Sequence, residues 1–464
     1  MKKKYRNSTY TLIISLFLFL LVVICCKINT YATDLNSECI NVLVKDSSNS
    51  ELVKKELEAA DKSVDIEEIA EIGLLKINFP SDKIIEEIKT NRNIAMAGEI
   101  ADVIVEDKRI IEENPNLDKV LMPPIPNSIS ENAEDNDSSL LEYFNWYKDI
   151  MTENEKALNV SKGEGIHIGI IDSGIDQSHP LLDDKLDLTK AKSFTEDKTS
   201  IVDENGHGTM VAGIIAQISP EAILTPYKVI SSESGESFWT LQAIVQAVND
   251  GQNILNMSLG TYKYENNSEE KMTIEAYERA IEYAVEHDVI VVASSGNNGL
   301  DLDAEYEENG MLHLPGSISG VLSTSAITKE KLIAAYSNTG SDVQYTAPGG
   351  EYVYIDGYLD VIPSIYTTYP TYFDNMLGTI GIPQGYMFTV GTSMAAPCIT
   401  AAVADYSAYY AKITGSFPTL DNIQEAISKG CVDLGAIGKD NVYGYGLPKV
   451  IDSYNYVTIN NEER

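Results

Sequence analysis

The sequence is poor in basic residues and in cysteine. Its 464 residues include 34 Lys and Arg against 70 Asp and Glu, which gives a formal net charge of −36. A chain this acidic is not expected to bind nucleic acid, because phosphates require basic patches. Five cysteines are too few for a disulfide scaffold, and Cys25, Cys26 and Cys39 lie near the N-terminus. Cys398 and Cys431 leave two alternatives open, one disulfide bridge or two free thiols.

Long hydrophobic runs are also scarce. The longest, residues 11–26, follows a basic start with Lys2, Lys3, Lys4 and Arg6, and residues 30–32 offer small side chains for a cleavage site. The run is shorter than the about 20 residues that span a membrane. We therefore expect a signal peptide at 1–32 and a secreted, extracellular product without a C-terminal anchor. Membrane retention by an uncleaved N-terminal segment is the alternative.

The region after this leader predicts a small α+β domain, which we place at residues 33–113. Hydrophobic patterning predicts strands at 41–44, 73–79 and 101–105, and helices at 51–60 and 82–90, the second capped by Ser81. This order is typical of a ferredoxin-like, split βαβ domain. Residues 114–139 are rich in Pro, Asn, Ser and acids, and they predict a linker that is open to proteolysis.

From residue 140 to 464 the pattern changes to alternating strands and helices. Strands are predicted at 166–171, 222–229, 254–257 and 289–293, and helices at 208–218, 239–250, 274–287 and 396–411. Such alternation predicts an α/β fold with a doubly wound, mainly parallel sheet. Ligands of such sheets bind beyond the carboxyl ends of the strands.

Three residues at such positions form a candidate catalytic set. Asp172 ends a buried strand, His207 stands among glycines at a helix start, and Ser393 precedes a helix. Serine is a weak nucleophile at neutral pH, so it needs a base and a group that orients the base. Asp, His and Ser in this order match one of the chain orders that build such a triad. We predict Ser393 as nucleophile, His207 as general base and Asp172 as the orienting carboxylate.

An oxyanion site is predicted from a fourth residue. Asn297 follows the strand 289–293, where its amide could act with the backbone N–H of Ser393 on a developing oxyanion. Asp176 and the other four histidines fit the catalytic roles less well. His313, for example, lies in an apolar stretch and belongs to no motif.

Five motifs together resemble the subtilases, the subtilisin-like serine proteases. They lie at residues 171–176, 205–213, 256–260, 296–299 and 391–397. The resemblance runs from about residue 145 to 457. It implies a serine endopeptidase made as a zymogen, with the small domain as prodomain and intramolecular inhibitor, self-cleavage within 114–139, and a monomeric enzyme.

The resemblance also implies how the substrate is bound. Ser258, Leu259 and Gly260 should form an edge strand that pairs with the peptide, and Gly235 should lie in the opposing strand. No cofactor is required for the chemistry. His179-Pro180 is followed by Leu181, which argues against calcium at the usual first site. Structural calcium at Asp183 and Asp184 is the alternative to a solvated acidic surface, and no metal ligand is assigned.

Two stretches bear on the substrate. The acids at 301, 303, 305, 307 and 308 predict a preference for Arg or Lys before the scissile bond. The tyrosine-rich stretch 349–377 is either a packed excursion or an exosite. Size and acidic subsites resemble the lantibiotic leader-processing proteases, so we expect a peptide precursor as substrate, cut after a basic residue. The alternatives are a general degradative extracellular protease and a non-catalytic secreted binding protein.

Overall fold

The computed structural model describes residues 38–105, 108–109, 117–123, 136–232 and 234–462. The chain forms two compact units, with the boundary between Glu99 and Ile100. The predicted signal peptide and most of the predicted linker fall outside the described residues and stay predictions. Within the described part of the chain, no helix has the length and apolarity needed to cross a membrane.

The first unit is a four-stranded antiparallel sheet with two helices. Its elements are β1 (Cys39–Val44), α2 (Ser50–Ala60), β2 (Asp65–Ile69), β3 (Leu74–Asn78), α3 (Asp82–Thr90) and β4 (Ile94–Gly98). The strand order β2-β3-β1-β4 is that of the split βαβ arrangement, so the predicted ferredoxin-like fold is confirmed. Apolar side chains from both helices and from β1 and β3 form its core.

Two details of this unit differ from the prediction. β2 and β4 were not predicted, because β2 carries Asp65, Glu67 and Glu68 and β4 is rich in small residues. Ser81 does precede α3, but its hydroxyl donates to Asp61 instead of capping the helix, at 2.7 Å. This bond ties the start of α3 to the end of α2.

The second unit is built on a seven-stranded sheet of order β17-β16-β14-β12-β8-β10-β9. All of its strand pairs are parallel, as predicted. The strands are β8 (His167–Asp172), β9 (Lys192–Ser193), β10 (Ile223–Lys228), β12 (Ile254–Met257), β14 (Ile290–Ser294), β16 (Val321–Ile327) and β17 (Val343–Pro348). β8, β12 and β14 are central and buried along almost their whole length, which accounts for their continuous apolar runs.

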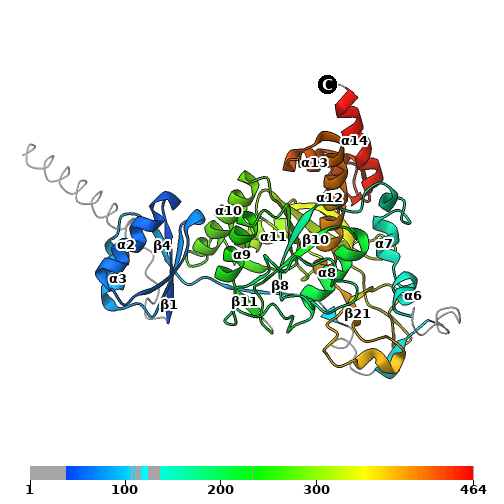
Figure 1. Cartoon of the computed structure of the whole chain (residues 1–464), viewed down its shortest axis with the longest axis horizontal. Coiled ribbons are helices and arrows are strands. Elements are labelled where there is room, and N and C mark those ends of the chain that lie inside the picture. Colours follow the sequence, from blue (N-terminus) through cyan, green and yellow to red (C-terminus); the bar gives the residue numbers. More distant parts are fainter. Residues whose placement is uncertain (1–37, 106–107, 110–116, 124–135, 233, 463–464) are drawn as a thin grey trace, which may run out of the picture. The chain divides into compact units, whose positions relative to one another are not determined.

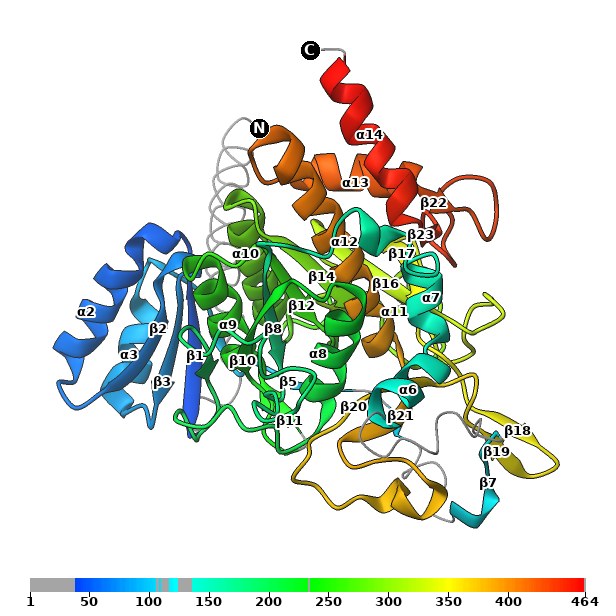
Figure 2. The ribbon, with the colours of Figure 1, turned by 45° about the vertical axis from the view of Figure 1, so that its right-hand side comes forward.

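Helices cover both faces of this sheet (Figures 1 and 2). α8 (His207–Ile218) and α12 (Thr392–Thr414) pack against each other on one face, and α9 (Ser237–Asn249) and α10 (Lys271–Glu286) pack against each other on the other. α13 (Leu420–Lys429) and α14 (Val450–Glu462) follow α12. The doubly wound architecture predicted from the alternating pattern is therefore confirmed.

The second unit also contains shorter elements, several of which lie near the carboxyl ends of the sheet. They are α6 (Asn136–Tyr143), α7 (Trp146–Met151), β11 (Ser234–Glu236), β13 (Thr261–Tyr264), α11 (Leu302–Asn309), β15 (Met311–Leu314), β20 (Ile365–Thr368) and β21 (Tyr386–Val390). β7 (Val120–Leu121) joins β18 (Val353–Ile355) and β19 (Tyr358–Asp360) in a small sheet of three strands. β22 (Cys431–Val432) and β23 (Leu447–Pro448) form a pair near the C-terminus.

One predicted strand forms with a different partner. Residues 101–105 were expected to close the N-terminal sheet, and β5 (Asp102–Ile104) does form there. It pairs with β11 in the second unit, however, so its assignment to the first sheet was wrong. β6 (Lys108–Arg109) likewise pairs with β21 of the second unit. Alternating apolar residues predict a strand but do not identify the neighbour with which it pairs.

The two alternatives left open for Cys398 and Cys431 are resolved in favour of free thiols.

The tyrosine-rich stretch 349–377 contains both buried and exposed tyrosines. Tyr366 and Tyr369 are buried, whereas Tyr354, Tyr358 and Tyr372 are exposed to 52%, 43% and 47%. Part of the stretch is therefore a packed excursion, as one of the two alternatives held, and part is open to solvent.

We predict that Gly213→Ala destabilises the second unit by about 1–3 kcal/mol, the usual effect of overpacking. A Cβ at Gly213, on α8, would lie 2.0 Å from Oγ1 of Thr368 and 2.8 Å from that of Thr367. Both hydroxyls donate to carbonyls of α8, so neither can move without losing a bond. Denaturant unfolding measures the change.

Gly378→Ala is the control for this substitution. Its nearest neighbours, at 3.1 Å and beyond, belong to the flexible side chain of Asn375. Equal unfolding midpoints for the two variants would contradict close packing of α8 against β20.

Candidate active site

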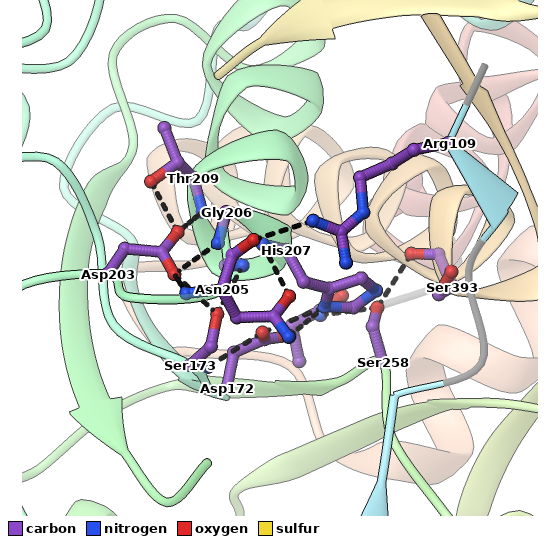
Figure 3. Close-up of polar contacts among 12 residues, drawn as sticks. Arg109, Asp172, Ser173, Asp203, Asn205, Gly206, His207, Thr209, Ser258 and Ser393 are labelled. Atoms are coloured by element: carbon purple, nitrogen blue, oxygen red, sulfur yellow. Dashed lines mark hydrogen bonds and ion pairs between the residues drawn. The ribbon is translucent and has the colours of Figure 1, made fainter. Parts of the chain in front are cut away.

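Asp172 and His207 form a buried pair at the carboxyl end of the sheet. Asp172 is the last residue of β8, and His207 is the first residue of α8. The imidazole Nδ1 lies 2.8 Å and 3.0 Å from the two carboxylate oxygens, and neither residue is exposed. The carboxylate therefore fixes the orientation of the ring and leaves Nε2 as the other polar edge. Figure 3 shows the ring between Asp172 and Ser393.

Asp203, a residue that the sequence analysis missed, holds the loop that leads into α8. It is fully buried. It accepts hydrogen bonds of 2.6–3.1 Å from three backbone N–H groups and two hydroxyls, those of Asn205, Gly206, Thr209 and Ser173 (Figure 3). Burial raises the pKa of Asp203, and these hydrogen bonds act in the opposite direction. The Ser173 hydroxyl also accepts from the Gly208 N–H, so one carboxylate fixes the backbone on both sides of His207.

Ser393 stands in the first turn of α12. Its side chain is 2% exposed, and its Oγ has no hydrogen-bond partner among the described residues. Its carbonyl accepts a hydrogen bond of 2.8 Å from the hydroxyl of Ser258, which follows β12 (Figure 3). The first turn of a helix presents backbone N–H groups and the positive end of the helix dipole, which favour a negative charge. An unengaged hydroxyl in this place suits a nucleophile.

Asn297 lies beside Ser393. Its Oδ1 accepts hydrogen bonds from the backbone N–H and the hydroxyl of Thr392, at 2.8 Å and 2.7 Å. A Cβ placed on Gly391 would lie 2.8 Å from Ser393 Oγ and 3.3 Å from Asn297 Nδ2. The two side chains thus flank the same small space, with the amide donor held on one side of it. Asp172 is thus paired with His207, Asn297 lies beside Ser393, and the imidazole lies between Asp172 and Ser393 (Figure 3).

Asp176, the alternative to Asp172, takes no part in this group. Its carboxylate accepts from Ser178 and from the N–H and hydroxyl of Thr371. It therefore joins the loop after β8 to the segment after β20.

No group of three or more potential metal-ligating side chains is found in the described part of the chain. Asp184 forms an ion pair of 2.8 Å with Lys185. Whether calcium binds at Asp183 and Asp184 stays as open as the sequence left it.

A strand of the chain itself lies between two of the predicted substrate-binding residues. β5 pairs antiparallel with β11, where Val103 is opposite Gly235. On its other side, Ile104 exchanges two hydrogen bonds with Gly260, of 3.1 Å and 3.2 Å. The predicted substrate-binding residues Gly235 and Gly260 thus lie on either side of an extended segment of residues 102–104. Val103 is fully buried in this arrangement.

Arg109 makes a further contact with the segment that leads to His207. β6 pairs with β21, and the guanidinium of Arg109 donates to the Asn205 carbonyl at 2.8 Å (Figure 3). Asn205 lies two residues before His207. Residues 102–104 therefore contact Gly235 and Gly260, and Arg109 contacts the loop before His207.

A pocket opens beside Ser393. Its lining consists of Ser258, Leu259, Gly260, Ser294, Gly296, Asn297, His313, Thr392 and Ser393. His313, which belonged to no sequence motif, is part of this lining because β15 pairs with β13 directly after Gly260. The sequence did not indicate this role, because His313 lies in a short apolar strand and belongs to no motif.

The acids at 301–308 do not line this pocket. Asp301 caps α11, Asp303 accepts from Ser341 and Asn441, and Glu305 accepts from Asn309. Glu307 and Glu308 are exposed residues of the same helix. None of these acids is therefore in a position within the described pocket that would support the predicted preference for Arg or Lys before the scissile bond.

Fold and site together define a class of protein, and comparison with known proteins agrees with it. Residues 163–446 match the model of the subtilase family. The chain belongs to the subtilase family and carries a subtilisin-like serine endopeptidase domain.

Three known proteins illustrate what this chain is similar to. The chain is 31% identical over 297 residues to the minor extracellular protease Epr of Bacillus subtilis (strain 168), a match that covers 61% of this chain but only 38% of that protein. It is 25% identical over 388 residues to the epidermin leader peptide-processing serine protease EpiP of Staphylococcus epidermidis, covering 72% of this chain and 77% of that protein. The crystal structure of a lanthipeptide protease superposes with a TM-score of 0.65 at 32% identity, covering 71% of this chain and 97% of that one.

We predict that Asn297→Ala lowers kcat by about 10²–10³, the usual effect of removing one oxyanion donor. KM should change little, because the donor acts on charge that develops in the transition state. Steady-state kinetics of the mature enzyme on a peptide substrate measures both constants. Asn298→Ala, which truncates the exposed neighbouring amide, is the control and should keep the wild-type kcat. Equal kcat values for the two variants would rule out the oxyanion role.

Proposed function

We propose that this chain is the precursor of a secreted endopeptidase that removes the leader from a lanthipeptide precursor. EpiP is named a leader peptide-processing protease and the solved structure a lanthipeptide protease, and this chain covers 77% and 97% of those two proteins. A third relative, Epr, is described as an extracellular protease, which supports export.

The observation that carries the proposal is the extended strand β5 held between β11 and Gly260. Backbone hydrogen bonds on both sides of a peptide are typical of recognition by strand addition. They hold any sequence in one register, while the neighbouring pockets choose side chains. A site of this kind suits a defined stretch of a peptide precursor.

The geometry of the site suggests the following mechanism. Ser393 Oγ attacks the carbonyl carbon of the scissile bond, and His207 Nε2 takes its proton. Asp172, bonded to Nδ1 at 2.8 Å, stabilises the imidazolium. The oxyanion is bound by the Asn297 amide and the Ser393 N–H. His207 then gives the proton to the leaving amine, and water releases the acyl group from Ser393.

We propose that the small N-terminal unit acts as prodomain and inhibitor of the same chain. Its own core makes it a separately packed unit, and β5 begins three residues after its boundary at Glu99. A short connection of this kind keeps the cleft-bound strand joined to the unit.

We predict that Ser393→Ala yields a precursor that keeps its N-terminal unit after signal removal. Without the hydroxyl no acyl intermediate forms, so maturation of its own chain stops. Intact mass spectrometry of the secreted protein measures this, with Ser407→Ala, a buried serine of the same helix, as control. Normal maturation of the Ser393 variant would show that another protease does the cutting.

Leader removal is tested separately, with purified mature enzyme and a lanthipeptide precursor. A single cut at the leader junction is expected. Digestion at many sites would favour a general degradative protease. Binding without a cut would favour the non-catalytic alternative.

A further inference from the structure

The guanidinium of Arg109 lies beside the loop that leads to His207. Arg109 is the last residue of β6 and is opposite Thr389 of β21. Its Nη1 donates to the Asn205 carbonyl at 2.8 Å and to the Tyr369 hydroxyl at 3.4 Å. Figure 3 shows the side chain reaching from its strand to Asn205. The chain's own arginine therefore shows where a basic side chain is accepted.

Both acceptors are held in place by the structure around them. Asn205 is buried, and its side-chain amide donates to the Ser232 carbonyl at 2.8 Å. Tyr369 is also buried, and its backbone N–H donates to the Gly385 carbonyl at 2.6 Å. A Cβ at Gly206 would lie 2.4 Å from the Tyr369 ring, so the tyrosine packs directly against the loop. The carbonyl and the hydroxyl therefore form a preformed acceptor site.

The acceptor site lies in a region of negative charge. Asp203 and Glu204 directly precede the carbonyl that accepts from the arginine. The Tyr372 hydroxyl donates to the Asp203 carbonyl at 2.8 Å, and burial together with the carboxylates of Asp203, Asp176 and Glu204 raises the pKa of Tyr372. Lys228 forms an ion pair of 2.8 Å with Glu204 and compensates part of this charge. The remaining carboxyl groups favour a cation over an anion at this place.

Chain direction places this site after the scissile bond. Ile104 is opposite Gly260 in an antiparallel bridge, so β5 runs towards Ser258, whose hydroxyl bonds the backbone of Ser393. β6 runs away from Ser393, because its first residue is opposite the last residue of β21 and its second residue is opposite the one before it. A peptide bound in the same direction therefore has its later residues on the β21 side.

We infer that the Asn205 carbonyl and the Tyr369 hydroxyl form a subsite for a basic side chain, arginine above all, on the part of the substrate that follows the scissile bond. Arginine fits better than lysine because its planar guanidinium presents several N–H donors to two acceptors at once. The inference rests on the proposed endopeptidase function. It differs from the predicted preference for Arg or Lys before the scissile bond, and it gives Tyr369 of the tyrosine-rich stretch a part in substrate binding.

The first experiment uses a peptide that the mature wild-type enzyme cuts at a single bond. Arg, citrulline, Ala or Glu is placed in turn at each of the first four positions after that bond. At one position we expect kcat/KM for Arg to exceed that for Ala by about 10-fold, the effect of a hydrogen bond to a charged group, and Glu to fall below Ala. Most of the gain should appear in KM, because the subsite binds the side chain equally in the ground state and in the transition state.

Citrulline keeps the shape of arginine and lacks its charge, so it should fall below Arg. Equal values for citrulline and Arg would contradict a site for a cation. A second series places Arg directly before the scissile bond. If Arg fails to exceed Ala at all four positions after the bond, or has an effect only before it, the inference is overturned.

The second experiment tests the role of the tyrosine. Tyr369→Phe removes one of the two acceptors and keeps the ring against the loop, so the Arg-to-Ala ratio should fall at least about twofold. Tyr366→Phe, the same change at a buried tyrosine of the same stretch, is the control and should keep the wild-type ratio. The same ratio in both variants would overturn the assignment of Tyr369 to the subsite. Cleavage of the Ala peptide reports that the Tyr369 variant is folded, and if it does not fold, the wild-type peptide series alone decides.

The outcomes separate the two proposals. If the wild type cuts no peptide and matures as the Ser393→Ala chain does, the endopeptidase proposal fails and the inference fails with it. If it cuts peptides without any preference for Arg after the bond, only the inference fails. If it prefers Arg there but does not process a lanthipeptide precursor, the inference stands and the choice of substrate fails.

Discussion

The parallel pairing of β14, β12 and β8 is the constraint on which the site depends. Adjacent parallel strands end at the same edge, so Asp172, Ser258 and the loop of Asn297 are brought together by sheet register alone. α12 crosses this face of the sheet and carries Ser393 to the same edge, where the Ser258 hydroxyl fixes it. Asp172, His207 and Ser393 are therefore positioned by elements of the core, and Asn297 by the loop after β14, which Asn338 holds through the N–H groups of Asn298 and Leu300. Placement on such elements preserves the geometry that acyl transfer requires.

A single buried carboxylate gives the site its second layer of order. Asp203 accepts from backbone N–H groups just before α8 and in its first turn, which would otherwise be buried without partners. The backbone of His207 is therefore already held in place when its ring pairs with Asp172. Asn338 plays a similar role for the loop of Asn297. Its side chain accepts from the Asn298 N–H and donates to the hydroxyl of Tyr262, whose ring lies beside that of His313.

The sequence predicted those features that are coded locally. Asp172 follows an apolar run, and His207 and Ser393 stand among small residues at helix starts, so each position was visible in its own few residues. The roles of Asp203 and His313 depend on contacts between segments far apart in the chain, for example the pairing of His313 with Tyr262. The strand at 101–105 was predicted, but its partner was not, because periodicity indicates which residues share a face and not which strand lies alongside. The acids of 301–308 follow Asn297 closely in sequence, but none of them is in the pocket lining, because they cap or belong to α11, where Glu307 and Glu308 are exposed.

The strand β5 has a consequence for the kinetics of the whole chain. In the proposed function, β5 occupies the place of the substrate and belongs to the same polypeptide. It then competes with any outside peptide at the effective concentration of a tethered ligand, which is in the millimolar range for short connections. A free substrate at micromolar levels cannot displace it unless it binds far more tightly. Cutting the chain does not remove the strand from its hydrogen bonds with β11 and Gly260 but turns an intramolecular equilibrium into one that dilution can shift. Activity would then appear with a delay that depends on the concentration of the protein.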